Sequence, residues 1–212
     1  MRFTLRRLRT ELSPLYGKRE AEAMIRLIFS HLKGWRPVDI VLHEDDTLTD
    51  YMHRKVSEIL SRLKKHEPLQ YILGQARFFG RDLKVTPAVL IPRPETEELV
   101  QLALGRLGSR RDLHLLDACT GSGCIAVALA RNLPFPEITA IDLSAGALGV
   151  ARENARALRV KVDFVQTDAL SLEEGSLPGE PWDAIVSNPP YIGEMERLTI
   201  CLLYTSPSPR DS

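Results

Sequence analysis

The stretch "SNPPY" near the end of the chain has residue types that can hold a planar amide or amine. Asn188 ends "WDAIVSN", a mostly apolar run that predicts a strand over 182–188, and Pro189, Pro190 and Tyr191 follow it. The Asn188 side-chain carbonyl and the Pro189 backbone carbonyl can each accept one N–H, the prolines stiffen the segment, and Tyr191 can stack on the planar group. Because such a nitrogen is a poor nucleophile, fixing its position would help its methylation by about 7–11 kcal/mol at best. The alternative is a proline-rich loop that only ends a strand.

A glycine-rich turn follows an earlier predicted strand and begins with an acidic residue. "LHLLD" (113–117) ends at Asp117, and "DACTGSGC" continues to residue 124. Gly121 and Gly123 let the backbone turn tightly beside a ligand. The spacing is neither the dinucleotide pattern G-x-G-x-x-G nor a P-loop, because no G-K-[ST] follows. The turn resembles the first motif of S-adenosylmethionine-dependent methyltransferases; alone, it could also be an ordinary tight turn.

Two more carboxylates follow the next two predicted strands. Asp142 ends "EITAID" (137–142), where a carboxylate can accept hydrogen bonds from ribose hydroxyls. Asp168 comes just after "VKVDFVQ" (160–166), where it can accept from an adenine amino group. Asp142 and Ser144 could instead only cap the next helix, and Asp168 could only serve its loop. Since these groups follow successive strands, we expect them to form one site with Asn188.

The elements that must position these residues form an α/β arrangement. Strands alternate with helices, expected over 124–133 and 144–158, which predicts a parallel, doubly wound sheet. Such a sheet binds ligands beyond the carboxyl ends of its strands. The helix expected over 92–108 has Pro94 in its first turn.

The part of the chain before residue 70 is expected to be helical. Apolar residues recur every three or four positions in 18–34 and 47–68, which predicts a small bundle, with Thr47 and Asp50 capping the second of these helices. Gly80-Arg81-Asp82 is expected to turn a β-hairpin between "QARFF" and "LKV". The expected domains are a helical domain over 1–70, a hairpin linker over 71–92, a partial methyltransferase domain over 93–196, and a non-native tail over 197–212.

Composition excludes several other classes of protein. The 212 residues carry a formal net charge of zero, so no global field draws the chain to nucleic acid or membrane. The three cysteines do not form a disulfide framework, and Cys119 with Cys124 lacks the further ligands of a metal site. We find no signal peptide and no apolar run of membrane-spanning length, and therefore expect a cytoplasmic protein without a metal.

The segment before the glycine-rich turn narrows the class of enzyme. "PLQYILGQARFFGRDLKVTPAVLIPRPETEELV" (68–100), with "DACTGSGCIAVALA" and "SNPPYI", closely resembles the protein-(glutamine-N5) methyltransferases that modify peptide chain release factors. The resemblance runs from roughly residue 15 to 193. It implies a bacterial, cytoplasmic enzyme of translation termination whose cofactor is S-adenosylmethionine. Its partner would be a release factor, modified at the glutamine of its Gly-Gly-Gln motif and docked with help from the helical domain.

The resemblance also assigns roles to residues of this chain. Asn188, Pro189, Pro190 and Tyr191 would bind the substrate amide, with Asn188, Pro189 and Tyr191 as the catalytic group. Arg93, Thr96 and Glu97 match the "RPxTE" stretch and would shape the cofactor pocket. Predicted cofactor contacts are Asp117, Cys119, Thr120, Gly121, Ser122, Gly123, Asp142, Asp168, Ala169 and Asn188.

Adenine-N6 DNA methyltransferases use a similar Asn-Pro-Pro-aromatic group, so a nucleic-acid amine methyltransferase is the alternative. Neutral charge and the absence of a basic stripe near the site argue against duplex binding. A third alternative is an inactive remnant.

Two features depart from the family pattern. Cys119 stands where the motif often has glycine, and we expect an ordinary backbone conformation there. After Glu196, "LTICLLYTSPSPRDS" resembles a frameshift or translated vector sequence, which predicts a truncated enzyme with poor solubility and weak or absent activity.

Overall fold

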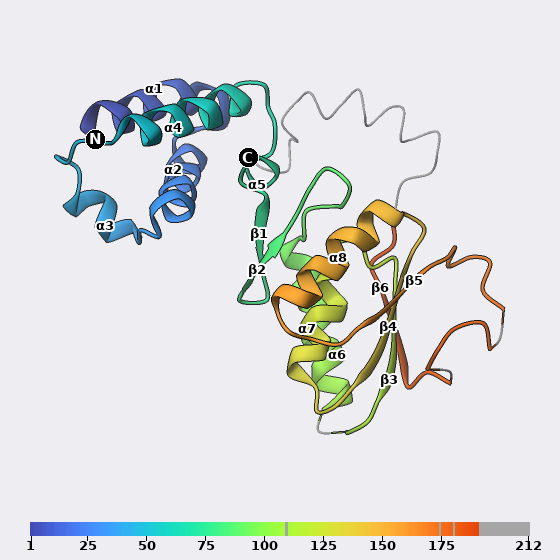
Figure 1. Cartoon of the computed structure of the whole chain (residues 1–212). Coiled ribbons are helices and arrows are strands. Elements are labelled where there is room, and N and C mark those ends of the chain that lie inside the picture. Colours follow the sequence, from blue (N-terminus) through green and yellow to red (C-terminus); the bar gives the residue numbers. More distant parts are fainter. Residues whose placement is uncertain (109, 174, 180, 191–212) are drawn as a thin grey trace. The chain divides into compact units, whose positions relative to one another are not determined.

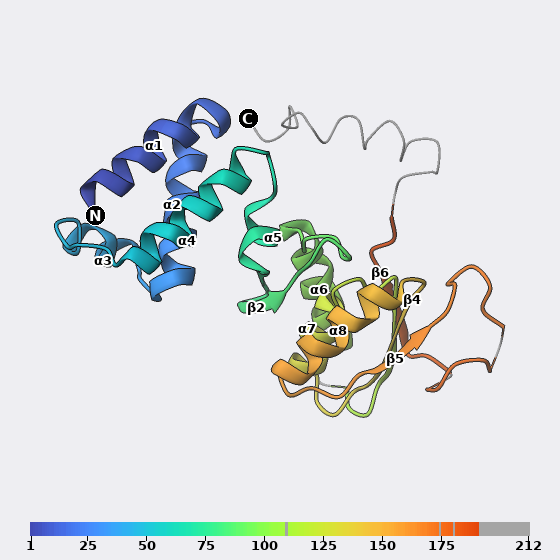
Figure 2. The same ribbon diagram turned by 45° about the horizontal axis from the view of Figure 1, so that its top comes forward.

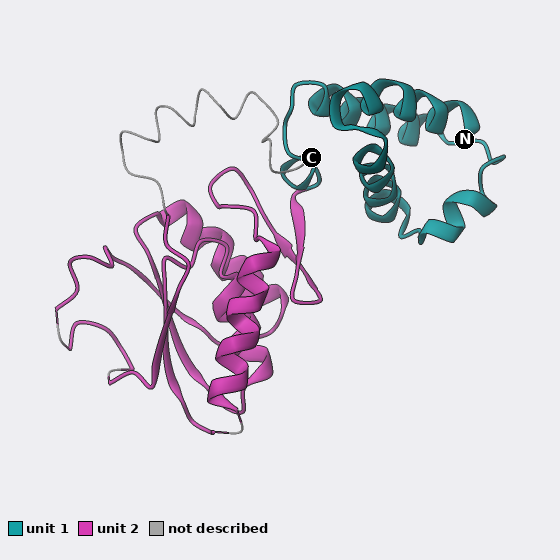
Figure 3. Ribbon diagram, turned by 180° about the vertical axis from the view of Figure 1, so that it is seen from behind, with its two compact units in different colours: residues 1–73, 192–212 teal, residues 74–191 magenta. Residues whose placement is uncertain are grey.

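The computed structural model describes residues 1–108, 110–173, 175–179 and 181–190. These residues form two compact units, one ending at Leu73 and the other beginning at Gly74 (Figure 3). Among the described residues, no helix is both long and apolar enough to cross a membrane. Each unit has its own hydrophobic core.

The first unit is helical. Its described elements are α1 (Arg2–Tyr16), α2 (Lys18–Lys33), α3 (Pro37–Leu42), α4 (Asp50–Leu63) and α5 (Leu69–Leu73). Apolar side chains at helical spacing meet in one core, in which Leu8, Leu12, Ile28 and Leu63 have no exposed surface. The predicted cap at Thr47 is wrong: Thr49 precedes α4, and its Oγ1 accepts the Met52 N–H at 3.3 Å. The helix therefore begins later than the Thr47–Asp50 spacing indicated.

The second unit opens with the predicted β-hairpin. Strands β1 (Gln75–Phe78) and β2 (Arg81–Lys84) pair antiparallel, with Phe78 opposite Arg81. The turn is Phe79-Gly80, one residue earlier than expected, and both residues have positive φ values of 44° and 73°. Two left-handed residues are what a two-residue turn with the strand twist requires. Phe79 is the strained member, and its N–H is held by Glu97 Oε1 at 2.8 Å.

A parallel sheet forms the centre of this unit (Figure 1). Its described strands are β3 (His114–Ala118), β4 (Glu137–Asp142), β5 (Asp163–Gln166) and β6 (Ala184–Ser187), in the order β5-β4-β3-β6. Every described pairing in this sheet is parallel. The chain leaves β3 toward β4 and β5 and then returns to the other side of β3 as β6. The order therefore reverses between β3 and β6, and such a switch point is where open α/β sheets bind ligands.

Helices α6 (Pro94–Leu107), α7 (Cys124–Asn132) and α8 (Ala145–Ala157) all lie on one face of this sheet (Figures 1 and 2). Their apolar residues share a core with Leu115, Ile138 and Ala140 of the strands. The opposite face carries Leu116 and Ile141, which pack against Leu177 and the partly buried Trp182 of the β5–β6 connection. The predicted doubly wound sheet would have helices on both faces, and the described residues show a helical layer on one face.

Candidate active site at the carboxyl ends of the strands

Asp117 closes β3 and fixes the glycine-rich turn to α7. The residue is 1% exposed, and its Oδ2 accepts the Thr120 hydroxyl at 2.6 Å and the Ala126 N–H at 3.0 Å. These bonds join the strand, the turn and the first turn of the helix through one carboxyl group. Asp117 Oδ1 and the buried Ser122 Oγ have no hydrogen-bond partner among the described residues. Burial is the main reason that the pKa of Asp117 rises to about 7.

The turn itself runs through unusual backbone conformations. Cys119 has a φ of 63°, so the expectation of an ordinary conformation at this position is wrong. The left-handed region costs a residue with a Cβ roughly 1–2 kcal/mol, which is the physical reason for glycine in such motifs. Gly123 has a φ of 78°, and a Cβ at that position would come within 3.0 Å of the Ala151 Cβ. The turn can therefore lie close against α8 only because residue 123 is glycine.

Asp142 closes β4 and faces the same turn. Its Oδ2 accepts the Gly121 N–H at 2.9 Å, and its Oδ1 accepts the Ser144 N–H at 2.9 Å. Ser144 caps α8 as expected, because its Oγ accepts the Ala147 N–H at 3.2 Å. Each carboxylate oxygen has a second acceptor position, so these two bonds leave capacity for ribose hydroxyls. Asp142 thus shapes the turn in addition to the role predicted for it.

Asp168 follows β5 and organises its own loop. Its Oδ1 accepts the Leu170 N–H at 2.9 Å, and its Oδ2 accepts the Ser171 hydroxyl at 3.4 Å. Ala169 is partly buried and packs against the apolar cluster that contains Leu116 and Ile141. These contacts match the alternative, local role; adenine recognition by Asp168 and Ala169 stays a prediction.

The three strand-end carboxylates act on a common point, the Cys119 thiol. Burial raises the pKa of this thiol, and the charges of Asp142, Asp117 and Asp168 raise it further, whereas a hydrogen bond with Ser187 lowers it. The carboxyl groups at the ends of β3, β4 and β5 are therefore all near enough to Cys119 to raise the pKa of its thiol. A cluster of carboxylates suits a cofactor that carries a sulfonium, an ammonium group and ribose hydroxyls.

Asn188 brings the substrate motif to the same edge of the sheet. Ser187 Oγ donates to the Ala118 carbonyl at 2.7 Å, which ties the end of β6 to the end of β3. The Asn188 Nδ2 donates to Thr96 Oγ1 at 3.0 Å. Pro189 and Pro190 are exposed beyond the strand, and Tyr191 lies outside the described residues.

Sequence reasoning missed the contacts of two residues in this region and missed a third residue entirely. Thr96 and Glu97 were expected only to shape the cofactor pocket, yet Thr96 binds Asn188 and Glu97 binds the hairpin turn. Asn154 of α8 was not predicted at all. It is 2% exposed and holds both backbone groups of Lys84 and the Ser122 carbonyl, at 2.7 to 3.0 Å. A buried polar residue on an otherwise apolar helix face is the sequence signal that could have identified it.

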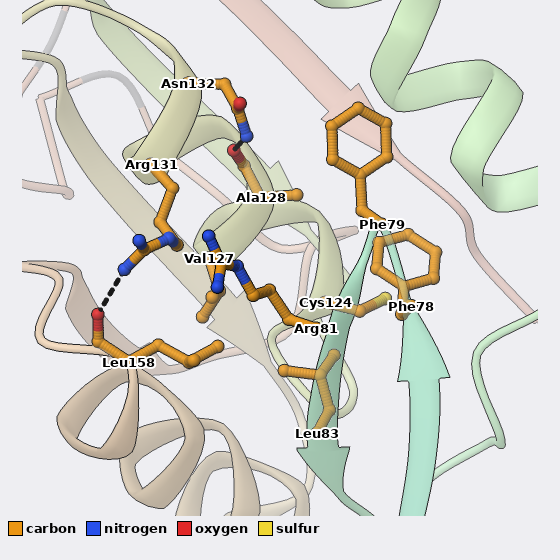
Figure 4. Close-up of a pocket in the computed structure, with 10 residues that line it drawn as sticks. All are labelled: Phe78, Phe79, Arg81, Leu83, Cys124, Val127, Ala128, Arg131, Asn132 and Leu158. Atoms are coloured by element: carbon orange, nitrogen blue, oxygen red, sulfur yellow. Dashed lines mark hydrogen bonds between the residues drawn. The ribbon is translucent and has the colours of Figure 1, made fainter. Parts of the chain in front are cut away.

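A cavity of about 180 Å³ lies elsewhere in this unit, between the hairpin and α7 (Figure 4). Its walls include Phe78, Arg81, Cys124 and Arg131, and Arg131 Nη1 donates to the Leu158 carbonyl at 2.7 Å. Burial raises the pKa of the Cys124 thiol to about 12, so this thiol is inert near neutral pH. The volume is below the roughly 300–1,000 Å³ of pockets for larger ligands. The cavity contains no predicted site residue and is not the candidate active site.

The fold is that of an S-adenosylmethionine-dependent methyltransferase, and a family model described as "Methyltransferase small domain" matches residues 98–202. A second family model, "PrmC N-terminal domain", matches residues 4–74. Release factor glutamine methyltransferase of Bacteroides thetaiotaomicron is 42% identical over 190 residues, covering 90% of this chain and 67% of the relative. The Streptococcus pneumoniae protein of the same name is 41% identical over 191 residues, covering 89% and 66%.

The chain belongs to the release factor glutamine methyltransferase family and spans about two thirds of the length of these relatives. Among solved structures, a Thermus thermophilus 16S rRNA N2 G1207 methyltransferase, in complex with AdoMet and guanosine, is 23% identical. The match covers 55% of this chain and 32% of the chain of that methyltransferase, with a TM-score of 0.46.

Proposed function

We propose that this protein transfers a methyl group from S-adenosylmethionine to the side-chain N5 of the glutamine in the Gly-Gly-Gln motif of peptide chain release factors. The observation that carries the proposal is the position of Asn188. It follows β6 at the switch point of the sheet, and Ser187 ties that strand end to the Ala118 carbonyl beside the glycine-rich turn. A substrate amide bound by Asn188 would therefore lie beside the cofactor turn.

The residues that we propose hold the cofactor are the turn from Cys119 to Gly123, with Asp117, Asp142, Asp168 and Ala169. Asp142 supports this assignment because it keeps acceptor capacity after binding the Gly121 N–H. When bound, the cofactor supplies an electrophilic methyl group on a sulfonium. The carboxylates of Asp142 and Asp168, at the ends of β4 and β5, would favour binding of this positively charged cofactor over a neutral ligand.

Asn188 and Pro189 orient the acceptor nitrogen. Their two carbonyl groups would each accept one N–H of the glutamine amide, which fixes the nitrogen toward the methyl donor and excludes water from that position. The amide nitrogen would gain the methyl group as the S–CH₃ bond of the sulfonium breaks to leave a neutral thioether. Its proton would leave to water after the N–C bond has formed, so a strong base is not required. Pro189 and Pro190 limit the backbone movement of these acceptors, and we propose that Tyr191 packs on the amide plane.

The substrate class rests on the family. The relatives are named release factor glutamine methyltransferases, and the first unit of this chain matches the "PrmC N-terminal domain". We propose that this helical unit contributes to binding the release factor.

A single-turnover assay with the protein in excess tests the proposal, because it detects slow transfer. Labelled S-adenosylmethionine is incubated with a release factor, with the same factor carrying glutamic acid for the motif glutamine, or with duplex DNA. We expect label only in the unaltered release factor, and loss of that label with Asn188→Ala. Label in DNA, or in the glutamic acid variant, would contradict the proposed substrate; full transfer by Asn188→Ala would contradict the role of the amide.

A further inference from the structure

We infer that Thr96 is a positioning residue that sets the orientation of the Asn188 side chain, so that its carbonyl oxygen is directed to the substrate amide. The inference rests on the proposed function and assigns a separate role to a residue of α6. Asn188 is an amide with a donor end and an acceptor end, and only the acceptor end can receive a substrate N–H. A protein group that binds the donor end would therefore fix which end faces the substrate.

Thr96 has the position and chemistry to do so. Its Oγ1 lies 3.0 Å from the Asn188 Nδ2, and the side chain is 5% exposed. A hydroxyl oxygen accepts the N–H of the amide, which leaves the Asn188 Oδ1 as the end that can accept from another group. Because the bond is partly buried, breaking it also leaves the donor without full hydration.

The backbone that carries Thr96 is held in place by hydrogen bonds. Thr96 lies in the first turn of α6, which begins at Pro94, and its own N–H is bonded to the Arg93 carbonyl at 3.0 Å. The neighbouring Glu97 fixes the hairpin through the Phe79 N–H. A hydroxyl on a helix that is anchored at its start holds a fixed point in space, as orientation of a reacting group requires.

The sheet fixes the other partner. Ser187 binds the Ala118 carbonyl at 2.7 Å, so the backbone before Asn188 is held at the end of β3. The Asn188 amide is therefore held from two sides, through its backbone by the sheet and through its Nδ2 by α6. Removing the Thr96 hydroxyl leaves the backbone of this segment held by the sheet and removes the bond from Asn188 Nδ2 to α6.

Three variants separate orientation from stability. Thr96→Val keeps the shape and removes the hydroxyl, and Thr96→Ser keeps the hydroxyl. The matched control is Thr139→Val in β4, because Thr139 is also buried, at 3% exposed, and its hydroxyl donates to the Pro178 carbonyl at 2.9 Å, outside the candidate site. All are made in the 212-residue chain.

The first measurement does not depend on activity. The sequence contains three asparagines, Asn132, Asn154 and Asn188, so their side-chain NH₂ groups are readily assigned by NMR. We expect one Asn188 Nδ2 proton to exchange slowly with water in the wild type, in Thr96→Ser and in Thr139→Val, and to lose that protection in Thr96→Val. Equal exchange in the wild type and Thr96→Val overturns the inference, whatever the enzymatic activity.

The second measurement follows methyl transfer to a release factor. Losing one net hydrogen bond predicts a roughly three- to tenfold lower kcat for Thr96→Val. The KM for the release factor and the affinity for S-adenosylmethionine should stay within twofold, and Thr96→Ser should recover most of the rate. An unchanged kcat in Thr96→Val, or an equal loss in Thr139→Val, overturns the inference while the proposed function stands. Absence of transfer by the wild type is the result expected of a truncated enzyme, and the exchange measurement then decides whether Thr96 orients Asn188.

Discussion

Asp117 should make the protein less stable as the pH rises toward neutrality. Its carboxyl is 1% exposed, and burial raises its pKa from an ordinary 3.8 to about 7. Between these two values the unfolded chain gives up the proton and the folded protein keeps it. The free energy of unfolding therefore falls as the pH rises through this window, and the loss is complete above about pH 7. About three pKa units at 1.36 kcal/mol each correspond to about 4 kcal/mol as an upper estimate.

Asp117→Asn removes this titration and keeps a side-chain oxygen that can accept the Ala126 N–H. Urea unfolding of both proteins between pH 4 and 8 measures the effect. We expect similar stability near pH 4, and an advantage for Asp117→Asn that grows to a few kcal/mol by pH 8. Other titrating groups contribute equally to both proteins and cancel in the difference.

The matched control is Asp183→Asn, because the pKa of Asp183 is lowered, first by its bond to the His114 N–H. An acid with a lowered pKa stabilises the fold above its unfolded pKa, so this variant should be the less stable protein at pH 7. Parallel stability curves for the wild type and Asp117→Asn from pH 4 to 8 would refute the reasoning about burial.

Three further predictions concern residues around the glycine-rich turn. Asn154→Ala removes three bonds to Lys84 and Ser122, so thermal or urea unfolding should show a loss of about 3 kcal/mol, and a loss below 1 kcal/mol would contradict the role of this side chain as a clamp. Cys119→Gly should be about 1 kcal/mol more stable than Cys119→Ala, because only glycine adopts a φ of 63° without strain; equal stability of the two variants would argue against a left-handed residue there. Ser144→Ala should cost about 1 kcal/mol in the same assay, since it removes the cap of α8, and no change would exclude that cap.

Much of the second unit could be predicted because its elements have strong local signals. Apolar runs that end in polar residues predicted β3, β4, β5 and β6, and the structure confirms all of them. The ends are less exact: β5 begins at Asp163, although the prediction started at residue 160. Period alone does not determine where hydrogen bonding with a neighbour begins, and here that depends on the pairing of Asp163 with Thr139.

Short elements and backbone conformation were beyond local reasoning. Helices α3 and α5 have only six and five residues, too few to show a helical period. The left-handed conformation of Cys119 was missed because a cysteine gives no signal for positive φ. It is forced by the surroundings: the Thr120 N–H must reach the Ile141 carbonyl at 2.9 Å while Asp117 holds the Thr120 hydroxyl. Tertiary bonds fixed this turn against the preference of one residue.

The two segments that carried the resemblance, "LIPRPETE" and "SNPPYI", also meet in space. Thr96 and Asn188 are 92 residues apart in sequence, and no periodicity or local spacing could join them. Their hydrogen bond gives a physical reason why one chain would carry both motifs: the second presents an amide, and the first holds one end of it. Without this hydroxyl, the amide would keep its place at the end of β6 but would lose the bond that holds its Nδ2. On this reasoning the helix before the first sheet strand is part of the catalytic apparatus, because it supplies the fixed point that the strand end lacks.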